Sequence, residues 1–448
     1  MDCTGQKNYR KFKGKKLLIL GGIYLHNKVV EAAKEMGVYT IVTDNVIDAP
    51  AKKIADKSYD IDISDVDSIV KMCKSERVDA VLTVMIDFCQ IYYQQICERL
   101  GLPCYGTYEQ FQIFTNKELF KKVCAENGVD IVPTYTEKNL DDQSIYPVLV
   151  KPAHNRGSRG QCVCQTREET MQALKLAKQL SDDGHAIIEK YMGNKEDFQI
   201  TYLVIDGIPY VVRTADRYLG PEKEGMDRVA VALSSPSSNT TLYMNNVHKN
   251  VIKMFANVGI KNAPVFMQGF VDEDTIRFYD PGLRFPGGNY DTGFTEIMDV
   301  NLMKLLVELA FEGKIDKPQQ LNENAWYLKG NTIFTLHSVI HPGRITKIEG
   351  AEELSKIEGV RCVNFRHKTG DEIEFTGTVN QRITETVISG NSKEAIIGAV
   401  QEVEKKLKVL DENGADMIIT DDPVLARETL MSYETTPLVV KMIKLFMK

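Results

Sequence analysis

Residues 146–160 read YPVLVKPAHNRGSRG and join an apolar strand to a loop rich in glycine and arginine. The strand ends in Lys151, and a lysine there either extends its ammonium group to solvent or is held for a charged ligand. The loop contains Gly157, Ser158 and Gly160, and small residues of this kind expose backbone N–H groups that can bind phosphate oxygens. No Gly-Lys-Ser/Thr follows, so the segment is not a P-loop, and a plain surface hairpin is an equal alternative.

Upstream of this segment, short apolar runs alternate with stretches of helical periodicity. The runs at residues 16–20, 38–43 and 80–86 predict strands. Strands that alternate with helices of about 10–13 residues predict βαβ units and a parallel sheet covered on both faces. The basic, polar residues 1–14 predict a flexible leader before the first strand.

A glycine pair follows the first predicted strand. Gly21-Gly22 lies where a dinucleotide-binding fingerprint would begin, and Asp44 lies near the distance expected of a ribose-binding acid, about 20 residues on. The third glycine of the fingerprint is missing. The pattern therefore favours a structural or substrate-lining role over nucleotide binding at this position.

A helix is predicted to begin near residue 115. Thr115 and Glu118 fit a capping box, in which Thr115 caps the helix and Glu118 returns three residues later. Lys117 then falls in the first turn, where the helix dipole disfavours a cation. A bound anion would explain the lysine, although a solvated side chain is the simpler alternative.

Two strands around residues 263–279 carry the oxygen donors of a candidate metal site. If they form a hairpin, Gln268 and Asp280 can approach each other and hold Mg²⁺ beside phosphate oxygens, because magnesium needs few protein ligands. Arg284, in the turn that follows, is suited to bind a carboxylate or phosphoryl group through two hydrogen bonds. A plain hairpin with a solvated acid and arginine is the equal alternative.

Composition excludes several classes of protein. The 448 residues carry 55 Lys+Arg against 62 Asp+Glu, a net charge of −7 that argues against a broad nucleic-acid-binding surface. No apolar run approaches the roughly 18 residues that span a bilayer. The nine cysteines contain no C-x-x-C pair and predict small core residues in a reducing, cytoplasmic compartment. His337 and His341 lie in a strand-like run that breaks at Pro342, so no zinc site is predicted.

Taken together and in this order, the segments resemble the ATP-grasp superfamily from about residue 15 to residue 410. The motifs that carry the resemblance are TNKELFKKVCAENGVDIVPTY (115–135), YPVLVKPAHNRGSRGQ (146–161), AIIEKYMGNKEDF (186–198) and FMQGFVDEDTIRFYDPGLRFPGG (266–288). The C-terminal part, with HPGRITKIEGAEELSKIEGV, resembles the closing domain of ATP-grasp amino-acid ligases and biotin-carboxylase-like enzymes.

The resemblance implies a fold of mixed α/β and α+β class. A Rossmann-like N-terminal domain would precede two α+β lobes that hold ATP between them, and a C-terminal domain would close the structure. The implied divisions are a Rossmann-like domain at 15–112, a small lobe with the phosphate lid at 113–192, a large lobe with the metal site at 193–315 and a closing domain at 316–448.

The resemblance also assigns roles to residues. Lys117 and Lys151 would bind the α- and β-phosphates, and Asp197, or Glu196, would bind the ribose. Arg284 would steady an acyl-phosphate and the substrate, and Arg217 is a candidate for the phosphate or carboxylate site, as is Arg213, with a surface salt bridge as the equal alternative. The remaining assignments are the lid residues Gly157, Ser158 and Gly160, the adenine-facing residues Glu189, Lys190, Tyr191 and Met192, and the metal ligands Gln268 and Asp280.

Two positions depart from the family pattern. Gln268 replaces the usual glutamate of the first metal ligand, and Gly282 replaces the usual asparagine two residues after Asp280. A neutral amide can coordinate Mg²⁺ through its oxygen but supplies less charge, so the resemblance implies either a weaker metal site or help from another group such as Asn289.

The function implied by the resemblance is ATP-dependent ligation of a small-molecule carboxylate to an amine. The carboxylate would attack the γ-phosphate to give an acyl-phosphate, with Mg²⁺ (or Mn²⁺) and cationic groups neutralising charge, and ADP and phosphate would be released. One alternative is a bicarbonate-activating carboxylase or carbamoyl-phosphate-synthase-like enzyme, and another is an ATP-binding protein with little turnover. Neither a nucleic acid nor a membrane is expected as a partner, and the family analogy allows a homodimer.

Overall fold

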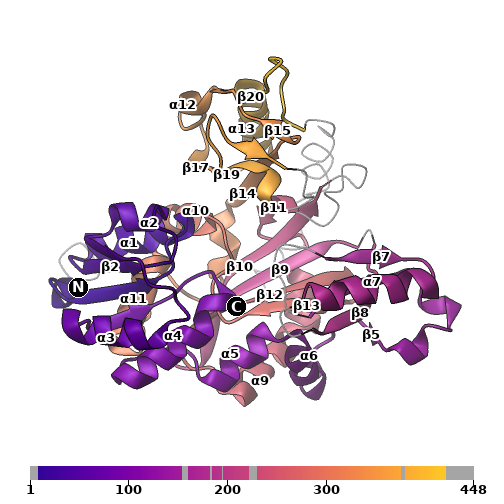
Figure 1. Ribbon diagram of the computed structural model, residues 1–448, viewed down its shortest axis with the longest axis horizontal. Helices are drawn as coiled ribbons and strands as arrows, with labels where there is room; N and C mark the ends of the chain where they lie inside the picture. The colour runs from indigo at the N-terminus through magenta and orange to yellow at the C-terminus, as the bar shows by residue number, and fades with distance from the viewer. Residues whose placement is uncertain are drawn as a thin grey trace, which may run out of the picture.

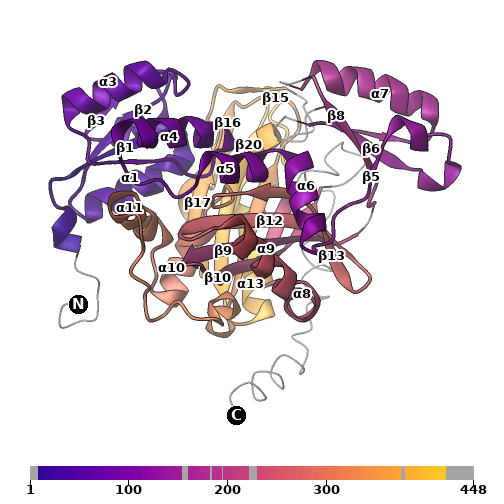
Figure 2. The ribbon, with the colours of Figure 1, turned by 90° about the horizontal axis from the view of Figure 1, so that it is seen from below.

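A computed structural model describes residues 9–153, 160–181, 184–193, 195–220, 230–374 and 379–419. Its three larger sheets have four, four and eight strands. In the two views the N-terminal sheet and the second four-stranded sheet lie at opposite ends of the molecule, with the eight-stranded sheet between them (Figure 1 and Figure 2). Within the described residues, no helix combines the length and apolar character that a membrane span needs.

The N-terminal sheet is parallel, with strand order β3-β2-β1-β4. Its elements are β1 (Lys16–Leu20), α1 (Asn27–Glu35), β2 (Tyr39–Thr43), α2 (Pro50–Ile54), β3 (Lys57–Tyr59), α3 (Val66–Glu76), β4 (Ala80–Leu82) and α4 (Asp87–Leu100). Asp44 accepts hydrogen bonds from the backbone N–H of Gly22 at 2.7 Å and of Val46 at 2.8 Å. Its carboxylate is therefore used to close the turns beside β1 and β2.

The start of the chain differs from the predicted flexible leader. Residues 1–8 lie outside the described part, but Tyr9–Phe12 form a 3₁₀ helix. Phe12 is fully buried, and its ring stacks on Phe311 with 5.1 Å between the centroids. The prediction is wrong for residues 9–12, because Phe12 and the partly buried Tyr9 pack against the core although the residues around them are basic.

The second four-stranded sheet is antiparallel, with strand order β5-β8-β6-β7. Its strands are β5 (Thr134–Tyr135), β6 (Val148–Pro152), β7 (Cys162–Cys164) and β8 (Ala186–Lys190), and α7 (Arg167–Gln179) packs on them. Two helices precede it, α5 (Tyr108–Thr115) and α6 (Lys117–Glu126).

The predicted cap of α6 at Thr115 is wrong by one residue. The Thr115 hydroxyl donates to the Phe111 carbonyl at 2.7 Å and so belongs to α5. The side-chain oxygen of Asn116 accepts from the N–H groups of Glu118 and Leu119 at 2.9 and 3.1 Å, which makes Asn116 the N-cap. Lys117 is still in the first turn, as predicted.

The eight-stranded sheet is antiparallel, with strand order β13-β12-β9-β10-β11-β14-β19-β17. Its strands are β9 (Asp197–Ile205), β10 (Ile208–Leu219), β11 (Ala230–Ser235), β12 (Ala263–Asp272), β13 (Thr275–Gly282), β14 (Thr332–Val339), β17 (Val360–Phe365) and β19 (Arg382–Gly390). The helices between them are α8 (Thr240–Asn246), α9 (His248–Val258), α10 (Tyr290–Met298), α11 (Leu302–Glu312) and α12 (Ala351–Leu354), and α13 (Lys393–Lys406) follows β19. The predicted boundary at residue 315 thus falls between strands of one sheet.

Gly282, the second departure from the family pattern, has a packing reason. A Cβ atom at this position would overlap the ring of Phe266, which lies opposite Gly282 in the β12–β13 register. Phe266 is 2% exposed, and the Arg284 guanidinium lies 4.7 Å from its ring centroid. A larger residue at position 282 would therefore displace a ring held from both sides.

The packing around Gly282 predicts that Gly282→Ala lowers stability by about 1–3 kcal/mol, because the added methyl group overpacks the site. Thermal unfolding of the purified protein measures it. Gly398→Ala is the matched control: Gly398 lies in α13 with open space around it, and alanine should add about 0.5–1 kcal/mol through helix propensity. Equal midpoints for the two variants would contradict the packing argument.

Candidate active site

Glu189 lies at the centre of a buried ion trio in the second four-stranded sheet. Its Oε2 is 2.5 Å from the Lys151 ammonium, and its Oε1 accepts from Lys121 on α6. The side chains of all three residues are no more than 7% exposed. Burial opposes the ionised form of Glu189, but Lys151 and Lys121 outweigh it and hold the pKa of Glu189 below its usual range. Burial also lowers the pKa of Lys151, with Glu189 opposing and Lys117 and Lys121 reinforcing the shift.

The ion trio holds the ammonium group of Lys151 in place, close to the eight-stranded sheet. Its ammonium lies 5.6 Å from the ring centroid of Tyr279 on β13. Lys117, at the start of α6, lies with its Nζ 3.4 Å from Oδ1 of Asp280. The two lysines predicted to bind phosphates therefore meet the strand that carries the predicted metal ligand, although they are far from it in the sequence.

Gln268 and Asp280 lie directly opposite each other in the β12–β13 register, as the predicted hairpin requires. The register shifts between Gln268 and Gly269, so Tyr279 is an extra residue on β13 next to the Gln268–Asp280 pair. The Tyr279 hydroxyl donates to Oε1 of Gln268 at 3.3 Å. The Asp280 side chain is 35% exposed, so its carboxylate is accessible.

These donors fit Mg²⁺ better than a softer metal. One carboxylate and one amide oxygen are a hard-oxygen set, and magnesium completes its shell with water and phosphate oxygens. Among the residues that the structure describes, no three His, Cys, Asp or Glu side chains gather as a metal site. The pair would therefore rely on a phosphorylated ligand for its remaining oxygens.

Asp197, predicted to bind ribose, is buried in a hydrogen-bonded group instead. It pairs with Arg217 on β10, and the Tyr279 hydroxyl lies 3.1 Å from its Oδ2. Burial raises the pKa of Asp197, while Arg217 opposes the shift. Its neighbour Glu196 is exposed and accepts from the Asn239 amide at 2.6 Å.

Arg284, predicted to contact substrate, forms a forked ion pair with Asp87 at the start of α4. Nε and Nη2 lie 2.6 Å from Oδ1 and Oδ2 of Asp87, respectively. The pair joins the N-terminal domain to the end of β13. The pair uses two of the five guanidinium N–H donors, and Nη1 donates a third to the Phe285 carbonyl at 3.1 Å. Nothing in the sequence around Asp87 signals the pairing.

The predicted adenine-facing segment lies at the end of β8. The Lys190 N–H donates to the Pro133 carbonyl at 2.9 Å, and the Tyr191 N–H donates to the Pro147 carbonyl at 3.2 Å. Both N–H groups are therefore used within the sheet. Met192 is buried, and its carbonyl accepts from the Lys195 N–H at 3.1 Å.

The predicted phosphate lid is described only at its end. Gly157 and Ser158 lie outside the described residues. Gly160 has a φ of +78°, a left-handed conformation that favours glycine where the chain enters β7.

Two residues that the sequence reasoning missed complete the site. Lys121 holds Glu189, and Tyr279 links Asp197 to Gln268. Both lie inside the quoted motifs, but a lysine one turn after Lys117 and an aromatic residue before Asp280 are too common to predict such contacts.

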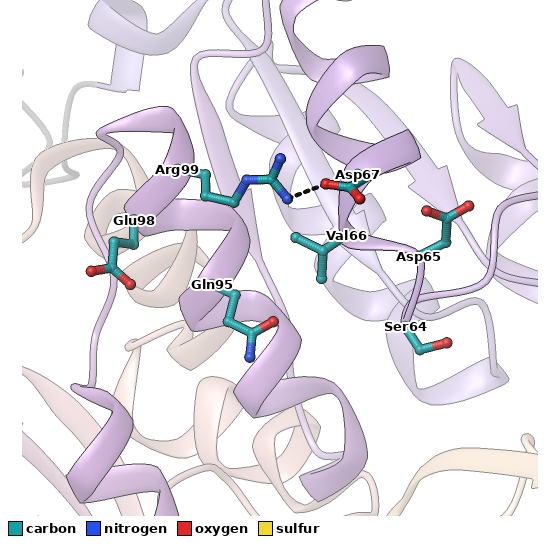
Figure 3. Close-up of a pocket in the computed structure, with 7 residues that line it drawn as sticks. All are labelled: Ser64, Asp65, Val66, Asp67, Gln95, Glu98 and Arg99. Carbon is teal, nitrogen blue, oxygen red and sulfur yellow. Dashed lines mark hydrogen bonds and ion pairs between the residues drawn. The ribbon is translucent and has the colours of Figure 1, made fainter.

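A separate hollow lies between α3 and α4 on the N-terminal domain (Figure 3). Its volume is about 370 Å³, and it is lined by Ser64, Asp65, Val66, Asp67, Gln95, Glu98 and Arg99. Arg99 pairs with Asp67 at 2.6 Å, and Asp65 caps α3. The Arg99–Asp67 pair thus joins α4 to α3, and Asp65 stabilises the start of α3. None of the lining residues belongs to the candidate site.

The buried trio predicts that Glu189→Gln destabilises the protein at neutral pH by about 3 kcal/mol or more, since two buried ammonium groups lose their counter-charge. Because the folded pKa of Glu189 is lowered, its stabilising effect exists above the ordinary value of 4.5 and disappears as the pH falls through the lowered value. Unfolding at neutral and acidic pH should therefore show a difference that shrinks at acidic pH. Glu196→Gln, on an exposed side chain, should change stability by less than about 0.5 kcal/mol; an equal loss there would contradict the argument.

Comparison with known proteins shows which protein families this chain resembles. The family models that match are "PylC-like, N-terminal domain" over residues 17–91, "Carbamoyl-phosphate synthase L chain, ATP binding domain" over 116–279 and "L-amino acid ligase C-terminal domain 2" over 338–410. The formate-dependent phosphoribosylglycinamide formyltransferase of Methanocaldococcus jannaschii is 28% identical over 197 residues, which cover 42% of this chain and 50% of that relative.

Solved structures agree in fold. The L-amino acid ligase of Bacillus licheniformis superposes with a TM-score of 0.73 at 18% identity, covering 90% of this chain and 100% of that one. The biotin carboxylase domain of the Hydrogenobacter thermophilus 2-oxoglutarate carboxylase, a dimer in complex with MgADP and bicarbonate, gives 0.72 at 18% identity, with 95% and 97% covered. The predicted mixed α/β and α+β fold is confirmed, and the matching family models support the predicted resemblance to the ATP-grasp superfamily.

Proposed function

We propose that the chain is an ATP-dependent ligase that joins a small-molecule carboxylate to an amine through an acyl-phosphate and releases ADP and phosphate. One observation carries the proposal: Lys117 lies beside Asp280 of the Gln268–Asp280 pair, and Lys151 lies beside Tyr279, the residue before Asp280. Two cations beside two oxygen donors suit a nucleotide phosphate chain with its magnesium ion. The names of the relatives include a ligase, a formyltransferase and a carboxylase domain solved with MgADP, which supports the same class of reaction.

In this proposal each residue of the site has a separate role. Lys117 and Lys151 bind the phosphates, and the buried Glu189 fixes Lys151 in place. Asp280 and Gln268 hold Mg²⁺, which supplies charge neutralisation at the phosphates when bound. Glu196 is the better ribose ligand because it is exposed, whereas Asp197 is committed to Arg217 and Tyr279.

The reaction itself is tested by ADP release from the full-length protein with Mg²⁺ over pairs of amino acids, with simple acids and bicarbonate as separate arms. We expect release that requires an acid and an amine together. Release with bicarbonate alone would move the assignment to a carboxylating enzyme. Tight ATP binding without release in any arm would contradict the ligase proposal and favour the weakly active ATP-binding protein.

The phosphate site is tested by Lys117→Ala and Lys151→Ala. Each should weaken nucleotide binding about 10- to 100-fold, because a charge-assisted hydrogen bond to phosphate is lost. Titration with a fluorescent ATP analogue measures it. Lys122→Ala, on an exposed side chain of the same helix, is the matched control and should bind normally. Unchanged binding by both site variants would overturn the placement of the phosphates.

A further inference from the structure

Tyr279 of β13 contacts both halves of the proposed nucleotide site, and the ligase proposal gives it no role of its own. Its hydroxyl lies 3.3 Å from Oε1 of Gln268, the amide that replaces the usual acid of the metal pair. The ammonium group of Lys151 lies 5.6 Å from the centroid of its ring. One side chain therefore touches a residue proposed to hold magnesium and a residue proposed to bind phosphate.

The backbone of the hairpin gives Tyr279 this position. In the β12–β13 register, Gln268 lies opposite Asp280 and Gly269 lies opposite Phe278, so Tyr279 is the extra residue of a β-bulge. Successive side chains of a regular strand point to opposite faces, and a bulge re-aims one of them. The bulge therefore allows Tyr279 and Asp280, although consecutive, to serve the same site.

The side chain of Tyr279 is held at both its ring and its hydroxyl. The ring stacks on Phe270 of β12, with 4.8 Å between the centroids and 25° between the planes. Nη1 of Arg217 donates to the hydroxyl oxygen at 2.7 Å. Because these contacts come from β12 and β10, the hydroxyl is a fixed point against which the more mobile amide of Gln268 is oriented.

The donors and acceptors around the hydroxyl show what its proton can do. The oxygen accepts from Arg217, and the proton is shared between Oδ2 of Asp197 at 3.1 Å and Oε1 of Gln268 at 3.3 Å. Asp197 also accepts from Arg217. Within the described part of the chain, Tyr279 is the hydrogen-bond partner of the Gln268 side chain. Asp197 thus has a second donor, whereas the orientation of Gln268 depends on Tyr279.

An amide ligand needs such orientation more than a carboxylate does. Either oxygen of a carboxylate can coordinate a cation, but only Oε1 of Gln268 can, and a half-turn of the amide would present its NH₂ group instead. The amide oxygen has two lone pairs, so it can accept from Tyr279 with one and coordinate Mg²⁺ with the other. Hydrogen bonds from outer residues to metal ligands orient those ligands and strengthen metal binding.

We propose that Tyr279 is a positioning residue for magnesium, whose hydroxyl holds the amide oxygen of Gln268 in the coordinating orientation beside Asp280. The proposal rests on the proposed ATP-dependent function. It explains how a neutral amide can serve where the family pattern has an acid, and it places the compensation on the extra residue of the bulge.

Metal-dependent nucleotide binding tests the assignment without turnover. The full-length protein is titrated with the fluorescent ATP analogue in EDTA and over a range of Mg²⁺ concentrations. Tyr279→Phe removes the hydroxyl and keeps the ring. It should raise the Mg²⁺ concentration that gives half of the metal-dependent gain in affinity about 10- to 100-fold. Binding in EDTA should stay unchanged, which also reports that the variant folds. An unchanged Mg²⁺ requirement would overturn the proposal.

A carboxylate at position 268 separates orientation of the ligand from support of the fold. In the Gln268→Glu background either oxygen can coordinate, so Tyr279→Phe should change the Mg²⁺ requirement by less than about threefold. An equal effect of Tyr279→Phe in the two backgrounds would show that the hydroxyl acts through the structure and would overturn the proposal.

Gln268→Met carries the test if Tyr279→Phe fails to fold. Methionine is close to glutamine in length but has no oxygen to coordinate magnesium. The variant should raise the Mg²⁺ requirement about as much as Tyr279→Phe, 10- to 100-fold, and keep normal binding in EDTA. A normal Mg²⁺ requirement in Gln268→Met would overturn the proposal, because Gln268 would then not be a ligand.

Tyr210→Phe is the matched control. Tyr210 also lies on the eight-stranded sheet, in β10, and has a lysine ammonium 5.4 Å from its ring centroid, that of Lys317. The variant should keep the wild-type Mg²⁺ requirement. Failure of the ligase proposal is distinguishable: a normal Mg²⁺ effect without ADP release would end that proposal alone, whereas nucleotide binding independent of Mg²⁺ in the wild type would overturn the role of Tyr279.

Discussion

The buried pairing of Glu189 with Lys151 and Lys121 is the constraint on which the rest of the site depends. It fastens α6 to β6 and β8, because a carboxylate without water must keep its counter-charges. With α6 and β6 fixed in this way, Lys117 at the start of the helix and Lys151 near the end of the strand reach the same end of β13. The ion trio is thus both a structural joint and the support of the proposed phosphate site.

The buried arginines of the molecule are held in two different ways. Arg284 and Arg217 are paired with Asp87 and Asp197, and in these positions they tie domains and strands together. Among the described residues, Nε of Arg366 and Nε of Arg382 are instead buried without a hydrogen-bond partner. Because the eight-stranded sheet runs from β13 to β17, it carries the proposed metal ligands Gln268 and Asp280 and these arginines on one continuous framework. This continuity fits a reaction in which one substrate must meet another at a fixed distance.

Much of the fold was predictable because local patterns decide it. Alternating apolar runs and helical stretches predicted the parallel N-terminal sheet, and the hairpin of β12 and β13 predicted that Gln268 would oppose Asp280. The errors also have local causes: Asn116 competes with Thr115 for the same helix start, and Phe12 is one buried ring in a basic segment. The reason for Gly282 lay outside any local pattern, since the ring of Phe266 belongs to the neighbouring strand.

The sequence by itself determined the class of fold and the resemblance to the ATP-grasp superfamily, and it singled out Lys117 and Lys151, because these depend on periodicity and on motifs whose residues lie close along the chain. Only the tertiary structure decided the partners of the charged groups. Arg284 is 197 residues from Asp87, and Lys121 is 68 residues from Glu189. Ion pairing inside a protein depends on distance and burial in space, and neither quantity is encoded in the spacing of residues along a chain.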